Sequence, residues 1–176
     1  VSMADYHVEE YVREINLAAT RLARELADEY TAKNPDKPRF VAGSVGPTNK
    51  TCSMSPDVNN PAYRALSYDE LAASYQQQME AMLEGGVDAI LIETIFDTLN
   101  AKAAIFAAEQ AMKATGVEVP VMLSVTVSDI GGRTLSGQTL DAFLASVQHA
   151  NIFSVGLNCS FGARQLKPFL EQLAAR

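Results

Sequence analysis

The sequence predicts an α/β protein whose parallel strands, joined by helices, form part of a (β/α)8 TIM barrel. Stretches with apolar residues at every third or fourth position alternate with short apolar runs, which is the pattern of helices and strands in turn. Strands connected through helices lie parallel, with right-handed crossovers. An open doubly wound sheet shares this alternation, but Gly43, Gly46 and Pro47 do not form the glycine-rich phosphate turn of a dinucleotide fold. We therefore expect half of a barrel, with about four parallel strands and flanking helices in one partial domain, residues 1–176.

The first helix is expected at residues 7–32, where the apolar positions form one stripe that should be buried. The stripe consists of Val8, Tyr11, Val12, Ile15, Ala18, Ala19, Leu22, Leu26 and Tyr30. The proline-containing segment 34–38 ends this helix, because proline cannot continue it. Ser67 and Glu70 form a capping box that begins a second helix, and Gly85-Gly86 ends it. Further helices are expected at residues 98–115, 139–150 and 161–176.

Short apolar runs mark the strands between these helices. They lie at residues 40–45, 89–92, 119–127 and 153–157. The run from Ala89 to Ile92 contains no polar residue, which is typical of a strand buried on both faces. Residues 48–64 are polar and contain prolines, so we expect a long loop, and such loops are usually functional or mobile.

Polar residues lie at the carboxyl ends of the four strands, and in a barrel they would converge on one mouth. They are Ser44, Glu93, Ser128 with Asp129, and Asn158 with Cys159. Glu93 ends an apolar run, so its carboxylate should bind either a substrate ammonium group or a Lys or Arg of the chain itself. Asp97 is expected to cap the following helix. Asp129 and Arg133 could hold each other or a substrate carboxylate, and Cys159 could be a buried hydrophobe or a functional thiol.

Composition excludes several classes of protein. The chain is 48% hydrophobic and 20% charged with a formal net charge of -7, which argues against a nucleic-acid surface or an anionic-membrane surface. No run reaches the roughly 20 apolar residues of a spanning helix, and no signal peptide is evident. Two cysteines do not make a disulfide framework, so a reduced, cytoplasmic protein is expected. Neither histidine follows a strand, so a Ser-His-Asp hydrolase is not indicated.

Six segments together resemble one family over essentially the whole chain. They are Val41-Ala-Gly-Ser-Val-Gly-Pro-Thr-Asn49, Ser55-Pro-Asp-Val58, Glu84-Gly-Gly-Val-Asp88, Leu91-Ile-Glu-Thr-Ile-Phe-Asp-Thr-Leu-Asn-Ala-Lys102, Gly132-Arg-Thr-Leu-Ser-Gly-Gln138 and Gly156-Leu-Asn-Cys159. In order and spacing they are similar to the homocysteine-binding domain of cobalamin-dependent methionine synthases, within the homocysteine S-methyltransferase family.

The resemblance implies a zinc-dependent barrel that transfers a methyl group from methylcobalamin, recharged by 5-methyltetrahydrofolate, to homocysteine thiolate, giving methionine. Cys159 matches the first of the family's three zinc-binding cysteines, and Glu93 matches the acid that contacts the substrate ammonium group. Asn158 is expected to brace Cys159, and Asn158, Ser128 and Asp129 join Glu93 as candidate substrate-binding residues. The cobalamin- and folate-binding domains of the parent protein are the implied partners.

The chain also departs from the family pattern. The other two zinc cysteines and the first strands, with their Asp-Gly segment, have no counterpart, so we expect the third to sixth barrel strands of a domain truncated at both ends. The isolated chain is then expected to be inactive, to bind zinc weakly and to self-associate through open edges. Two alternatives remain open. One is a cobalamin-independent homocysteine S-methyltransferase that uses betaine or S-methylmethionine, and the other is a non-catalytic self-associating fragment.

Overall fold

A single parallel sheet organises the protein, which is described over all 176 residues by a computed structural model. The strands are β1 (Ala42–Val45), β2 (Ala89–Ile95), β3 (Val121–Val125) and β4 (Ser154–Leu157), and their order in the sheet is their order in the chain. All three neighbouring pairs are parallel. Each strand therefore lies beside the next, as successive strands of a (β/α) barrel do, and the predicted fold class is confirmed.

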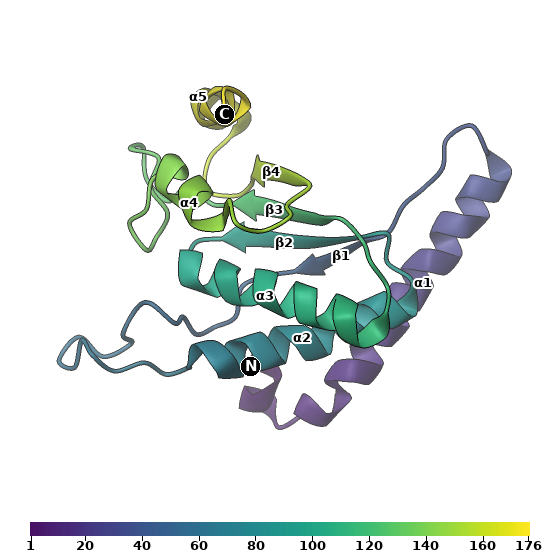
Figure 1. The fold of residues 1–176 in the computed structure, drawn as a ribbon, viewed down its shortest axis with the longest axis horizontal. Helices are drawn as coiled ribbons and strands as arrows, with labels where there is room; N and C mark the ends of the chain where they lie inside the picture. The colour runs from purple at the N-terminus through teal and green to yellow at the C-terminus, as the bar shows by residue number, and fades with distance from the viewer.

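Helices connect the strands and cover one side of the sheet. They are α1 (Val12–Lys33), α2 (Tyr68–Gly85), α3 (Thr98–Thr115), α4 (Leu140–Val147) and α5 (Ala163–Ala174), preceded by two short 3-10 turns. Helices α2 and α3 lie side by side against the sheet, α1 packs beyond α2, and α4 and α5 lie near β4 (Figure 1). No helix has both the length and the apolar composition needed to span a membrane.

Helix boundaries follow the capping signals of the sequence. The Ser67 hydroxyl accepts a hydrogen bond from the Glu70 backbone N–H, and the Glu70 carboxylate accepts one from Ser67, so the predicted capping box is present. Helix α2 ends at Gly86, which has a φ of 93°, a left-handed conformation that glycine adopts without strain. Asp97 caps α3 by accepting from the backbone N–H groups of Leu99 and Asn100, as predicted.

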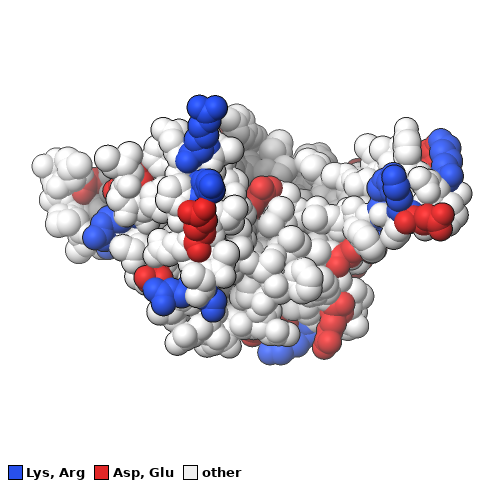
Figure 2. Space-filling model, turned by 90° about the horizontal axis from the view of Figure 1, so that it is seen from above, with Lys and Arg blue, Asp and Glu red and all other residues white.

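Only one face of the sheet is buried under helices. In β2, Ile90 and Ile92 are buried, whereas Ala89, Leu91 and Glu93 on the opposite face are partly exposed. The expectation that this strand is buried on both faces is therefore wrong, because α2 and α3 cover a single side. The opposite side carries both polar residues, such as Glu93 and Ser124, and the apolar Leu91 and Met122. In the view from above, Figure 2 shows acidic and basic groups scattered over a mostly uncharged surface.

The predicted buried stripe of the first helix is also wrong. Helix α1 begins at Val12, after a left-handed turn at His7, and the apolar stripe faces solvent, with Ile15 51% and Leu22 60% exposed. The inward side instead contains Thr20 and Ala27, which are buried, and Arg24, whose guanidinium lies 2.6 Å from the Asp88 carboxylate. This side packs against α2, where Thr20 lies directly against Gly85.

Candidate functional site

The carboxyl ends of the strands bring together the polar residues that the sequence singles out there. Ser44 at the end of β1 donates a hydrogen bond to the Glu93 carboxylate near the end of β2. Asn158, directly after β4, contacts both Thr94 of β2 and Ser124 of β3. A polar layer thus crosses all four strands at one edge of the sheet, where a barrel places its active site.

Asn158 is the most connected side chain of this layer. Its Oδ1 accepts hydrogen bonds from the Thr94 backbone N–H (3.2 Å) and the Ser124 hydroxyl (2.8 Å). Its Nδ2 donates to Thr94 Oγ1 (2.8 Å) and to Cys159 Sγ (3.2 Å). Cys159 itself is exposed at the rim, so the alternative of a buried, hydrophobic Cys159 does not apply.

Three residues at this edge have a left-handed backbone although none is glycine. The φ angles are 58° at Thr94, 61° at Cys159 and 58° at Ser160. For a β-branched residue such as Thr94 this conformation is a genuine outlier, and each such residue costs about 1–3 kcal/mol. At Thr94 the strand pairing shifts between Ile92 and Ile95. Strain of this kind persists only where the surrounding contacts hold the backbone in place.

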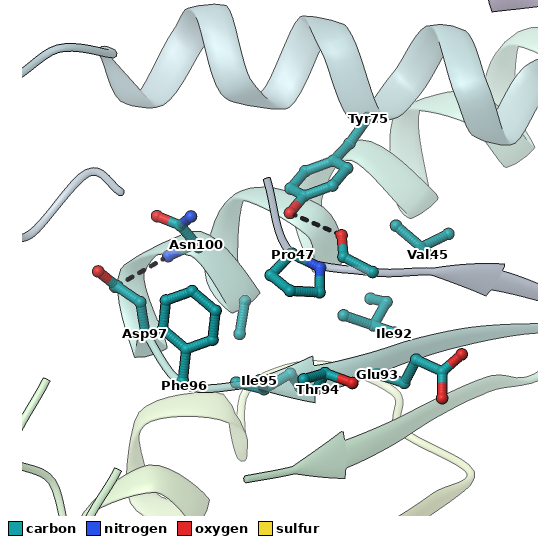
Figure 3. Close-up of a pocket in the computed structure, with 12 residues that line it drawn as sticks. Val45, Pro47, Tyr75, Ile92, Glu93, Thr94, Ile95, Phe96, Asp97 and Asn100 are labelled. Atoms are coloured by element: carbon teal, nitrogen blue, oxygen red, sulfur yellow. Dashed lines mark hydrogen bonds between the residues drawn. The ribbon is translucent and has the colours of Figure 1, made fainter. Parts of the chain in front are cut away.

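Glu93 lies on the open face of the sheet and has no cationic partner in the protein. Its hydrogen-bond partner is the Ser44 hydroxyl, and none of the six ion pairs includes it. The alternative of an internal pair with Lys or Arg is therefore wrong. In Figure 3, Glu93 points away from Tyr75 and Val45, whereas Ile92 points toward them. The carboxylate is thus available to a positively charged ligand.

Ser128 and Asp129 lie in a separate turn. The Ser128 backbone N–H donates to the Arg133 carbonyl, and Asp129 Oδ1 accepts from the Arg133 backbone N–H (3.1 Å). The Arg133 guanidinium donates to the Gly137 carbonyl and forms no ion pair with Asp129. Asp129 therefore stabilises its own turn, and no hydrogen bond joins this turn to Glu93, Asn158 or Cys159.

The start of α3 anchors the loops on both sides of the mouth. The Asn100 side chain accepts from the Cys52 backbone N–H (2.9 Å) and donates to the Lys50 carbonyl (3.1 Å), which fixes the loop after β1. Thr98 donates to the Gln138 side chain (2.7 Å), and the Ser136 N–H donates to the Phe96 carbonyl (3.1 Å), which fixes the loop after β3.

A cavity of about 20 Å³ lies between α2, β1 and the end of β2, next to this anchor (Figure 3). It has room for about one water molecule. The Tyr75 hydroxyl at its edge donates to the Gly46 carbonyl (3.2 Å). Burial, followed by the nearby Cys52 and Asp97, raises the pKa of Tyr75 to about 12. Its phenol is therefore neutral at physiological pH and acts as a hydrogen-bond donor.

The residues of this chain do not form a complete zinc site. Zinc takes three or four ligands in proteins, and no group of three His, Cys, Asp or Glu side chains is arranged to hold a metal ion. Cys159 is one exposed thiol, whereas Cys52 is buried in the core, where burial raises its thiol pKa. Further ligands would have to come from outside these residues.

Thr94 and Ser124 belong to the site but were not among the sequence candidates. Ser124 interrupts an otherwise apolar strand. It lies two residues after Met122, so both side chains point to the same, open face of the sheet. Thr94 follows Glu93 directly, and only its backbone conformation marks it, so no sequence signal identifies it.

Comparison with known proteins places this geometry in a family. The chain matches the model of the family described as homocysteine S-methyltransferase over residues 1–176. Two solved structures of the homocysteine methyltransferase MmuM from Escherichia coli are similar in fold. The apo form has a TM-score of 0.70 and 22% sequence identity, over 92% of this chain. The oxidized form has a TM-score of 0.74 and 21% sequence identity, over 98% of this chain.

This chain covers 55% and 58% of those two proteins, so it spans little more than half of their length. Its four parallel strands and flanking helices accordingly match part of their TIM barrel. The chain belongs to the homocysteine S-methyltransferase family.

Proposed function

We propose that this chain forms part of an enzyme that transfers a methyl group to the sulfur of homocysteine, giving methionine. The observation that carries the proposal is the unpaired Glu93 carboxylate on the same strand-end layer as the exposed Cys159 thiol, in a chain that matches the family throughout. A carboxylate without an internal cation suits the ammonium group of an amino acid.

The chemistry asks the site to hold homocysteine while its sulfur loses a proton and attacks the methyl group. Only the thiolate is a good nucleophile, and the bond between the methyl group and its donor breaks as the new carbon–sulfur bond forms. Glu93 would bind the ammonium end of the substrate. Cys159 would supply one thiolate ligand to zinc, the metal that lowers the pKa of a bound thiol, with the other ligands coming from outside these residues.

We infer that the methyl donor is methylcobalamin, recharged by 5-methyltetrahydrofolate, with cobalamin- and folate-binding domains as partners in a cytoplasmic protein. This proposal is supported by the segments at residues 91–102 and 132–138, which resemble those of methionine synthases. Assays with methylcobalamin, betaine and S-methylmethionine on a protein with the full set of zinc ligands would separate the donors. Turnover with betaine or S-methylmethionine, and none with methylcobalamin, would contradict the cobalamin assignment.

Binding of homocysteine by the 176-residue chain tests the role of Glu93 directly. We expect homocysteine to shift the NMR amide signals of residues 93–94 and 158–159, and Glu93→Gln to weaken its binding about tenfold, the loss expected for one charge-assisted hydrogen bond. Binding of 4-mercaptobutanoate, which lacks the ammonium group, should not change in this variant. Glu118→Gln removes an exposed acid that lies before β3, at the opposite end of the strands, and serves as the matched control. Homocysteine that shifts no signal near Glu93 would refute the proposal.

Zinc content of the same chain tests the metal part of the proposal. We expect far less than one zinc per chain, with or without homocysteine, and no methyl transfer, because one thiol does not hold the metal tightly. Stoichiometric zinc that is lost in Cys159→Ala would show instead that this chain completes the site, for example across a dimer.

A further inference from the structure

The side chain of Asn158 has no hydrogen-bonding capacity left for a ligand. An asparagine side chain has two N–H donors and an oxygen with two lone pairs, so it makes at most four hydrogen bonds. In Asn158 all four are used, by the Thr94 N–H, Thr94 Oγ1, Ser124 Oγ and Cys159 Sγ. Every partner belongs to the protein itself.

The orientation of this amide is fixed by one of its partners. The backbone N–H of Thr94 can only donate, so the Asn158 atom that faces it at 3.2 Å must be the oxygen. The nitrogen then faces Thr94 Oγ1 and Cys159 Sγ, both of which can accept. A flipped amide would place its NH2 group against the Thr94 N–H, two donors facing each other, and would lose that hydrogen bond.

Asn158 also connects three strands. Its backbone N–H donates to the Val125 carbonyl at the end of β3 (3.1 Å), and its side chain reaches Thr94 near the end of β2. The residues that it holds, Thr94 and Cys159, both have the left-handed backbone that costs free energy. Two hydrogen bonds from one amide to Thr94 provide the restraint that this backbone needs.

We propose that Asn158 is a positioning residue and not a substrate contact. Its oxygen holds the end of β2, which carries Glu93, and its nitrogen holds the Cys159 sulfur at the mouth. One side chain thereby sets the positions of the group proposed to bind the substrate ammonium and of the proposed thiol ligand. The inference rests on the proposed function for the importance of these two groups, but not for the contacts themselves.

Asn158→Asp separates the two parts of this role, the oxygen that accepts from Thr94 and the nitrogen that donates to Cys159. A carboxylate can still accept from the Thr94 N–H and the Ser124 hydroxyl, but it has no N–H to donate to the Cys159 sulfur. Asn158→Leu has a similar volume and removes all four bonds. Ser124→Ala removes one bond to the oxygen and leaves both N–H donations, so it is the matched control.

Two measurements on the 176-residue chain without ligand report on the two halves. Hydrogen exchange at the Thr94 amide reports on the oxygen, and the rate at which iodoacetamide alkylates Cys159, followed by peptide mass spectrometry, reports on the nitrogen. Cys52 is buried, so its peptide is an internal reference. Circular dichroism and thermal unfolding check that each variant is folded.

In Asn158→Asp we expect Thr94 to keep its protection within about threefold, while alkylation of Cys159 slows about tenfold, because the sulfur loses its N–H donor and faces a new carboxylate. In Asn158→Leu both readouts should change by about tenfold. In Ser124→Ala, iodoacetamide should alkylate Cys159 at a rate within about twofold of that in the unsubstituted chain, because the Asn158 nitrogen still donates to the sulfur.

A purely structural role for Asn158 would alter stability and Thr94 exchange but leave alkylation unchanged in Asn158→Leu, which adds no charge beside the sulfur, and this outcome would overturn the proposal. So would rapid exchange of the Thr94 amide in the unsubstituted chain, because it would mean that the amide is free to serve a ligand. Failure to bind homocysteine would count against the proposed function alone, because neither readout uses homocysteine.

Discussion

Tyr75 shows how one buried side chain connects the core to the mouth. It extends from α2, is 5% exposed, and its hydroxyl donates to the Gly46 carbonyl just after β1. The phenol can make this bond only while it carries its proton. Burial therefore both raises its pKa and makes the fold depend on the protonated form.

We expect the protein to lose stability in alkali through Tyr75. Its folded pKa of about 12 lies above the ordinary value of 10.0, so between these values the unfolded chain releases the proton first and the folded state is progressively disfavoured. The contribution of this group is complete below about pH 10 and falls by about 1.4 kcal/mol per pH unit between about pH 10 and the folded pKa of about 12. Urea unfolding of the unsubstituted chain and of Tyr75→Phe at increasing pH measures it.

Tyr75→Phe should cost about 1 kcal/mol near neutrality, because the Gly46 carbonyl loses its donor. The difference in stability between the two proteins should then shrink as the pH rises above about 10 and change sign. Burial also raises the pKa of Tyr68 and Cys52, but both proteins contain these residues, so the difference isolates Tyr75. A difference that stays constant with pH would contradict the expectation.

Among the secondary-structure elements, those with local signals were predicted well. Helix α3 begins after the Asp97 cap and ends before Gly116, and its bounds of Thr98–Thr115 are those expected from the sequence. The sequence left open whether Cys159 is buried or functional, and the structure shows it exposed. Glu93 was expected directly after a strand at residues 89–92, but β2 continues to Ile95, so Glu93 lies within the last residues of the strand. Helix caps and glycine stop signals depend on residues that are close together in the chain, so they can be recognised in the sequence.

Features that depend on distant residues could not be predicted. The partners of Asn158 follow from the register of three strands and from the shift between Ile92 and Ile95. The buried side of α1 was misjudged because burial was assigned to the most apolar side. The choice depends instead on close packing of Thr20 against Gly85 of α2, and no pattern within the first helix encodes that contact.

We expect Gly85→Ala to destabilise the protein by about 1–3 kcal/mol, although alanine favours helices. A Cβ at this position would lie 2.6 Å from Thr20 Cβ and 2.7 Å from its Cγ2, so α1 and α2 would have to separate. Denaturant unfolding measures the loss. Gly46→Ala, where a Cβ would have no neighbour within 4 Å, is the matched control and should change stability little.

Thr20→Gly combined with Gly85→Ala removes the atoms that collide. The double variant should be more stable than the sum of the single effects by at least about 1 kcal/mol. Simple additivity would show that the contact between the two helices does not determine how α1 is oriented.

At the scale of the whole molecule, the sheet has two unpaired edges and one uncovered face. Strands β1 and β4 each have a neighbour on one side only, and the apolar side of α1 with Ile15 and Leu22 faces solvent. Unpaired strand edges and contiguous apolar surface favour association with other chains. These features follow from a sheet that is part of a barrel.

We therefore expect the purified chain to self-associate, with an average mass that rises with concentration in light scattering after size exclusion. Ile15→Lys combined with Leu22→Lys should lower that mass, because the substitutions place charges within the exposed apolar side of α1. Glu25→Lys adds the same charge at an exposed polar position of α1 and should have little effect. A single monomer mass at every concentration would rule out the association.

The start of α3 gives the mouth a mechanical property. Asn100 binds the loop after β1, and Thr98 binds the loop after β3. Both loops are therefore attached to one segment of three residues, and Asp97 stabilises this segment by capping the helix. Because both loops are hydrogen-bonded to the same short segment, we expect the motion of one loop to be coupled to the motion of the other. The two rims of the mouth should therefore open and close in concert, and a ligand that orders one of them lowers the entropy cost of ordering the other.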